Sequence, residues 1–162
     1  MADEHSNGIL DGVFGTAPLL IPVPRSSLTV EGGIWPAYNI AAALVGHGIG
    51  ATVVPCLQRV RAVPKSAFAA SGARPKPIEH YESMTVTRMV VDRQELCLVD
   101  DVITKGATLL AAASRLHEAY PHARIVAFAL VRTLGFVEDI ERIIEPAIGT
   151  IGLRNDEAVR QP

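Results

Sequence analysis

The segment ELCLVDDV, residues 95–102, constrains the fold more than any other stretch of this chain. It contains an unbroken apolar run, Leu96 to Val99, which is typical of a strand that is covered on both faces. Two adjacent carboxylates, Asp100 and Asp101, follow directly. Strands of this kind belong to parallel sheets, and ligands of such sheets bind beyond the carboxyl ends of the strands. The segment therefore predicts an α/β fold and places two like charges where a ligand would bind.

The rest of the chain alternates between strand-like and helix-like patterns, which favours an α/β domain with a mostly parallel central sheet flanked by helices. Apolar residues recur at helical spacing in 34–48 and 107–120, and helix-stopping residues end both segments, so both are expected helices. The expected strands are 17–24, 51–57, 83–91, 95–102 and 124–131, followed by a helical turn in VEDIERIIEP and a last short strand around 148–151. We expect a flexible start at 1–16, and a long mobile surface loop at 59–80, which holds three prolines.

Length and composition favour one domain that spans residues 1–162, because 162 residues are enough to bury a core. The mean hydropathy is +0.26, yet no apolar run reaches the roughly 18 residues that a membrane helix needs. The start, MADEHSNG, is polar and acidic, unlike a signal peptide. We therefore expect a cytoplasmic protein with no membrane contact, in which Cys56 and Cys97 are buried thiols rather than a disulfide or metal site.

The net charge of −2 gives no overall attraction to nucleic acid. The sequence also lacks a basic stretch with interleaved aromatic residues, so nucleic acid is not an expected partner. The expected partners are small-molecule substrates, and a homodimer is left open.

A phosphate-binding turn is expected directly after the two aspartates. The letters ITKGAT lead into a helix whose first turn has unpaired N–H groups and the positive end of the helix dipole. The carboxylates repel a phosphate, but they can accept hydrogen bonds from the vicinal hydroxyls of a sugar that carries it. Hydroxyls and phosphate on one ligand indicate a ribose 5-phosphate. The turn residues expected to bind it are Thr104, Lys105, Gly106, Ala107 and Thr108.

The letters CLVDDVITKGAT resemble the phosphoribosyl-pyrophosphate (PRPP) signature of the type I phosphoribosyltransferases. The residue classes agree at nearly every position, except that Lys105 stands where many members have Thr or Gly. A looser resemblance extends from about Leu20 to Gly135, in which LIPVPRS looks like the pyrophosphate loop of the ComF-like group and 59–80 like its mobile loop. The resemblance implies a type I phosphoribosyltransferase fold with a reduced hood, without the zinc module that often begins ComF proteins.

The resemblance implies a transfer of phosphoribose from PRPP to a nitrogenous acceptor. Asp100 and Asp101 would hold the ribose, and Lys65 would meet the departing pyrophosphate as the third catalytic residue. Lys65 is one of five cations between residues 59 and 80, the others being Arg59, Arg61, Arg74 and Lys76. Against them stands one acid, so we expect this segment to face an anion. His80 is a weaker candidate, because an ordinary surface histidine is its simpler role.

The loop PVPRS is expected to cradle the same pyrophosphate through Pro24, Arg25 and Ser26, and the resemblance implies a strained or cis peptide there. Mg²⁺ would be bound mainly through PRPP, since no dedicated metal ligands are visible. Arg132, at the end of the 124–131 strand, could read an exocyclic oxygen of a purine acceptor, although a plain surface arginine is an equal alternative. Phe136 and Trp35 could stack on a base, with core packing the safer interpretation for Trp35.

Other functions remain as alternatives. A sensor that binds PRPP or a nucleotide without chemistry would keep the same motif, and the ComF resemblance also implies a weaker link to DNA uptake. A response-regulator receiver is disfavoured, because no lysine follows Lys105. A dinucleotide site is disfavoured too, because no G-x-G-x-x-G opens a helix.

Overall fold

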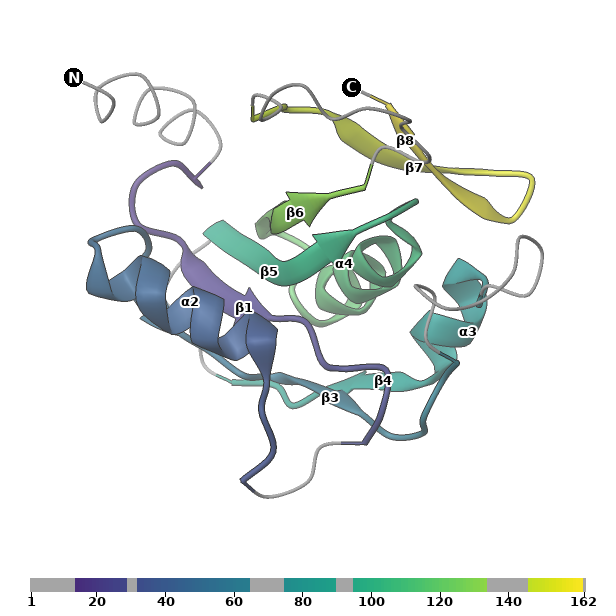
Figure 1. Cartoon of the computed structure of the whole chain (residues 1–162), viewed down its shortest axis with the longest axis horizontal. Coiled ribbons are helices and arrows are strands. Elements are labelled where there is room, and N and C mark those ends of the chain that lie inside the picture. The colour runs from purple at the N-terminus through teal and green to yellow at the C-terminus, as the bar shows by residue number, and fades with distance from the viewer. Residues whose placement is uncertain (1–13, 29–31, 65–74, 90–94, 134–145, 162) are drawn as a thin grey trace, which may run out of the picture.

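A computed structural model describes residues 14–28, 32–64, 75–89, 95–133 and 146–161. Its centre is a four-stranded sheet in the order β2-β1-β5-β6, in which every pairing is parallel (Figure 1). The strands are β1 (Leu19–Pro22), β2 (Thr52–Val53), β5 (Glu95–Ile103) and β6 (Arg124–Arg132). The predicted α/β class with a mostly parallel sheet is confirmed.

Two helices cover opposite faces of this sheet, α2 (Pro36–Gly46) in front and α4 (Ala107–Ala119) behind (Figure 1). Successive residues of a strand point to opposite faces, so β5 needs apolar side chains at consecutive positions. Cys97 and Val99 join Ala41 in the core under α2, while Leu96 and Leu98 pack with residues of α4. All four residues from Leu96 to Val99 are 0% exposed, which confirms a strand covered on both faces.

The expected strands at 51–57 and 83–91 are shorter than predicted, and they lie in two different sheets. The first contributes β2, breaks around Pro55, and resumes as β3 (Leu57–Arg59). A proline cannot donate to a strand ladder, which accounts for the break. The second is only β4 (Met84–Val86), which pairs antiparallel with β3 away from the main sheet. The predicted positions hold, but the predicted strands are too long.

Two expectations about irregular segments need correction. The end of the expected mobile loop, residues 77–80, belongs to the helix α3 (Pro77–Glu82). Proline is well tolerated at the first position of a helix, and the Lys76 N–H donates to the Glu79 carboxylate at 2.7 Å, which caps the helix start. Phe14, assigned to the flexible start, is buried against Phe128 with ring centroids 5.7 Å apart.

The chain closes on a hairpin of β7 (Thr150–Arg154) and β8 (Glu157–Gln161), where only one short strand was expected. Its turn residues, Asn155 and Asp156, both have positive φ, as the favoured two-residue hairpin turn requires. The helical turn expected in VEDIERIIEP lies outside the described residues, apart from its last residue. Cys56 and Cys97 are free and buried as predicted. Within the described residues, no helix has the length and apolar character to cross a membrane.

Candidate functional site

The carboxyl edge of the sheet brings together the segments that the sequence singled out. Pro22 at the end of β1 is opposite Val99, so the loop that follows β1 lies next to Asp100. The Val23 N–H extends this pairing by donating to the Val99 carbonyl at 2.9 Å. On the other side, Arg132 is opposite Ile103, the last residue of β5. The pyrophosphate-loop, ribose and acceptor residues proposed from the sequence therefore share one edge.

The two aspartates form a coupled pair. Each carboxylate accepts a bond from the next backbone N–H, 3.0 Å for Asp100 and 2.9 Å for Asp101. The pKa of Asp100 is raised from 3.8 to about 8. Burial is the largest cause, and the charge of Asp101 and a hydrogen bond with Asp101 add to it, whereas the charge of Arg59 opposes the rise. Asp100 is therefore mainly protonated at neutral pH. The pair can both donate and accept hydrogen bonds, which suits a ligand with vicinal hydroxyls.

A short turn lies between β5 and α4, where the sequence predicts phosphate binding. Gly106 has a φ of 90° and precedes the first residue of α4, so the free N–H groups of the helix start face this turn. The β7–β8 hairpin packs onto the turn, because a Cβ at Gly106 would lie 2.9 Å from the Ile151 side chain. Lys105 binds Glu157 of β8 at 2.8 Å in an exposed ion pair. Exposed pairs are worth about 0–1 kcal/mol, so a phosphate could compete for Lys105.

The loop after β1 is held by hydrogen bonds from side chains to backbone carbonyls. Trp35 donates its indole N–H to the Val23 carbonyl at 2.8 Å, and the Arg25 side chain donates to the Ile34 carbonyl at 2.8 Å. The described peptides are all trans, and residues 22–28 have no positive φ. The strained or cis peptide that the resemblance implied is therefore wrong. Trp35 is half-buried at the start of α2, rather than packed in the core, because its N–H binds this loop.

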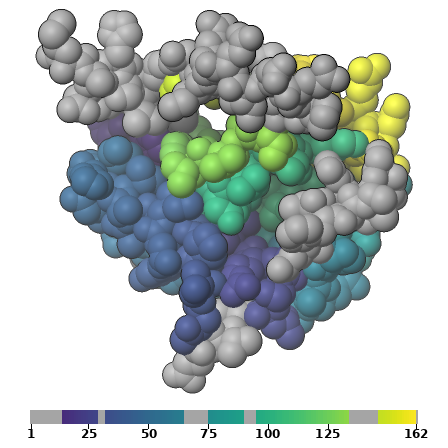
Figure 2. Space-filling model, in the orientation of Figure 1, coloured from purple at the N-terminus to yellow at the C-terminus, as the bar shows by residue number. Residues whose placement is uncertain are grey.

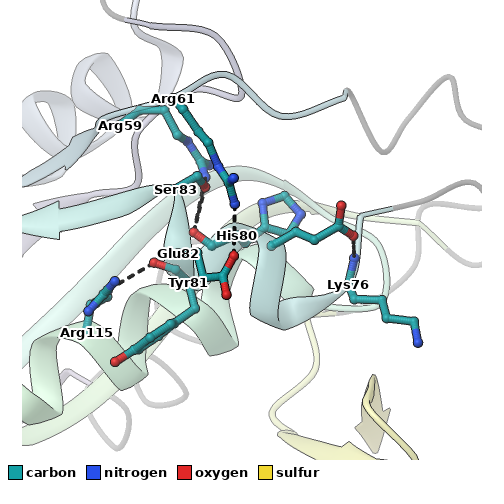
Figure 3. A network of polar contacts seen from close by, with 9 residues as sticks. Arg59, Arg61, Lys76, His80, Tyr81, Glu82, Ser83 and Arg115 are labelled. Atoms are coloured by element: carbon teal, nitrogen blue, oxygen red, sulfur yellow. Dashed lines mark hydrogen bonds and ion pairs between the residues drawn. The ribbon is translucent and has the colours of Figure 1, made fainter.

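The basic segment does not present its cations together. Arg59 is 6% exposed and turns inward, and Arg61 pairs with Glu82 at 3.0 Å (Figure 3). Lys76 is exposed, whereas Lys65 and Arg74 lie outside the described residues. The expectation of one anion-facing group is thus wrong for Arg59, which is buried, whereas the exposed pair of Arg61 with Glu82 leaves it a prediction for Arg61.

His80 is buried rather than a surface histidine. Its side chain is 2% exposed, and both ring nitrogens lack a partner among the described residues. Burial, followed by the charge of Arg59, lowers the pKa of His80 to about 4. The sequence held a weak signal for this burial, since His80 follows the buried Pro77 by one helical turn.

Other features limit what the described part of the site can hold. No group of three or more His, Cys, Asp or Glu side chains there is arranged for a metal ion. Two surface hollows of about 310 and 380 Å³ lie along the β7–β8 hairpin and beside α4, and neither includes the aspartates. In the space-filling view, β6 reaches the surface beside α2, so this face of the sheet is only partly covered (Figure 2).

Comparisons with protein-family models, with curated proteins and with solved structures give no match.

Proposed function

We propose that this protein is a Mg²⁺-dependent phosphoribosyltransferase of the type I class. It would transfer phosphoribose from PRPP to a nitrogenous acceptor and release pyrophosphate. The observation that carries the proposal is the pairing of β1 with β5, which places the Pro24–Ser26 loop beside Asp100 and Asp101. A ligand with a sugar between two phosphate groups fits this order of sites.

The parts of PRPP would be distributed along the edge of the sheet. The 5-phosphate would bind the N–H groups and hydroxyls between Thr104 and Thr108, at the start of α4. The ribose hydroxyls would bind the aspartate pair, and the pyrophosphate would lie along the loop after β1. This chain therefore contributes mainly positioning, which suits a reaction with a loose, charge-separated transition state.

The donor set fits a weakly held Mg²⁺. Two neighbouring carboxyl groups, one of them mainly protonated, are too few to form a complete cage, but Mg²⁺ usually keeps water and substrate phosphate oxygens as ligands. Asp100 or Asp101 would help to hold this ion at most indirectly, through its bound water. When bound, the ion would neutralise charge on the leaving pyrophosphate.

The decisive experiment measures pyrophosphate release from PRPP and Mg²⁺ with a panel of purines, pyrimidines and small amines. We expect release with at least one acceptor, and a 6-oxopurine is the best candidate, because Arg132 at the end of β6 could donate to its oxygen. Arg132→Ala should then lower activity with 6-oxopurines and spare acceptors without that oxygen. Tight PRPP binding without release for any acceptor would instead identify a sensor. The absence of PRPP binding would overturn both functions.

Asp101→Asn should weaken PRPP binding by about tenfold, the scale of one hydrogen bond to a charged group. Titration calorimetry on the folded variant measures this effect. Asp156→Asn is the matched control, because it makes the same charge change in the exposed hairpin turn. Equal affinities of both variants would show that Asp101 does not hold the ribose.

A further inference from the structure

Arg59 connects the candidate pyrophosphate loop to the interior of the protein. It is the last residue of β3, and its Nε donates to the Arg25 carbonyl at 3.0 Å. Its Nη1 donates to the hydroxyl of Ser83 and, at 3.4 Å, to the His80 carbonyl (Figure 3). One guanidinium therefore holds the loop after β1 against the segment that joins α3 to β4.

A second contact supports the same loop from the same direction. The Val63 N–H donates to the Ser26 carbonyl at 2.9 Å, just after β3. The backbone of Arg25 and Ser26 is thus fixed by two neighbouring points of the β3 segment. Both bonds use the carbonyl groups of the loop rather than its N–H groups.

Burial of Arg59 is energetically unfavourable for a residue that only holds the fold together. Its Nη2 is buried and has no partner among the described residues, and an unsatisfied buried donor costs about 1–3 kcal/mol. Well-packed apolar residues often replace buried charges without loss of stability. A buried arginine in this position therefore calls for a role beyond holding the fold together.

The charge of Arg59 reaches the aspartate pair. Burial lowers the pKa of Arg59 to about 10, with Asp100 opposing this shift, so the guanidinium stays charged at neutral pH. The charge of Asp101 raises the pKa of Asp100, and the charge of Arg59 lowers it. The charge of Arg59 also lowers the pKa of His80, which the charge of Glu79 raises. Arg59 is thus the positive charge that favours ionisation of Asp100.

We propose that Arg59 is a positioning residue, which fixes the loop after β1 at Arg25 by holding it against the segment that joins α3 to β4. It would align the pyrophosphate loop with the ribose-binding aspartates without contacting the substrate through Nε or Nη1. The proposal rests on the proposed function for its effect on PRPP, but the role in holding the loop concerns the ligand-free protein.

Two variants test this role. Arg59→Lys keeps the charge and removes the planar fork that reaches Arg25, so the loop should loosen. Arg59→Gln removes both the charge and the fork, so the loop should loosen as well. Arg61→Lys is the matched control, because Arg61 is two residues away and its ion pair among the described residues is with Glu82 on the surface.

Amide hydrogen exchange reports on the loop, because the Val63 N–H is bonded to Ser26. The Val54 N–H, bonded to Leu20 in the core, reports on global opening. We expect exchange at Val63 to be at least tenfold faster in Arg59→Lys and Arg59→Gln, with Val54 unchanged.

The outcomes distinguish this inference from the proposed function. If the wild-type protein binds PRPP, Arg59→Lys should weaken binding by at least tenfold and Arg61→Lys should not. If it does not bind PRPP, the proposed function fails, but hydrogen exchange still decides the role of Arg59. Equal acceleration at Val63 and Val54, or no change in either reporter, would overturn the positioning role. Should Arg59→Gln not fold, Ser83→Ala, which removes one anchor of Arg59, should accelerate Val63 selectively.

Discussion

Asp100→Asn is expected to raise the free energy of unfolding at pH 9 by about 2–3 kcal/mol while it weakens PRPP binding. The stabilisation follows from the raised pKa of Asp100, about 8 in the folded protein against 3.8 ordinarily. One pKa unit corresponds to 1.36 kcal/mol of stability. We count roughly half of the difference between the two pKa values, because the side chain keeps some contact with solvent, which screens its charge. Asparagine has nearly the same shape and carries no charge to desolvate.

The sign of the pH dependence follows from proton binding. Between pH 4 and 8 the folded protein holds a proton on Asp100 that the unfolded chain has released, so stability falls as the pH rises through this range. His80 acts in the opposite direction, since its lowered pKa makes stability rise between pH 4 and 6.5. Above pH 6.5 the Asp100 effect dominates, and near pH 9 the buried thiols of Cys56 and Cys97, whose pKa values burial raises to about 11 and about 12, add a smaller loss of stability in wild type and variant alike.

Urea unfolding at pH 6.5, 7.5 and 9 measures this effect. Wild type should lose stability across the series, and Asp100→Asn should lose much less, whereas Asp156→Asn should follow wild type. Parallel curves for wild type and Asp100→Asn would show that Asp100 is not protonated in the native state. Because the same substitution should weaken PRPP binding, its stabilising effect would mark Asp100 as a residue kept for function.

Gly106→Ala is expected to cost about 2–4 kcal/mol of stability and to weaken phosphate binding more than tenfold. A left-handed φ costs an L-residue about 1–2 kcal/mol, and Gly106 has a φ of 90°. The new Cβ would also lie 2.9 Å from Ile151, so the β7–β8 hairpin must move away from the turn. Urea unfolding and calorimetry with PRPP measure the two effects.

Two further variants divide the cost of Gly106→Ala. Gly152→Ala is the matched control in the same hairpin, because its Cβ would meet nothing within 4 Å and its φ is not positive. Adding Ile151→Ala to Gly106→Ala should recover the steric part and leave the backbone part. If Gly106→Ala proved as stable as Gly152→Ala, the hairpin would not pack on the phosphate turn as described.

The sequence predicts those parts of the structure whose causes are local. The run from Leu96 to Val99 requires burial on both faces, and this requirement alone indicates a parallel sheet with two helical layers. The turn from Asp100 to Gly106 was equally readable, because a glycine before an apolar helix indicates where α4 begins. Both follow from residues adjacent in the chain.

The parts that were missed depend on contacts between distant segments. Arg59 is an ordinary member of a basic stretch until β3 folds beside the loop at Arg25, 34 positions earlier. His80 is buried because α3 packs on α4. The prolines around His80 favoured a loop from the sequence alone and so concealed this helix. The hairpin rests on positive φ at Asn155 and Asp156, in a polar segment without a strong strand pattern.

The parallel pairing of β1 with β5 also has a consequence for folding. It places Leu19 opposite Leu96, so the long chain between them must close into a loop before the two halves of the site meet. Contacts of such long range are typically slow to form, because the entropy of closing the loop is lost before the contacts compensate for it. A ligand that bridges the two strand ends would then recognise only the completed fold. It should slow unfolding and leave the rate of folding almost unchanged.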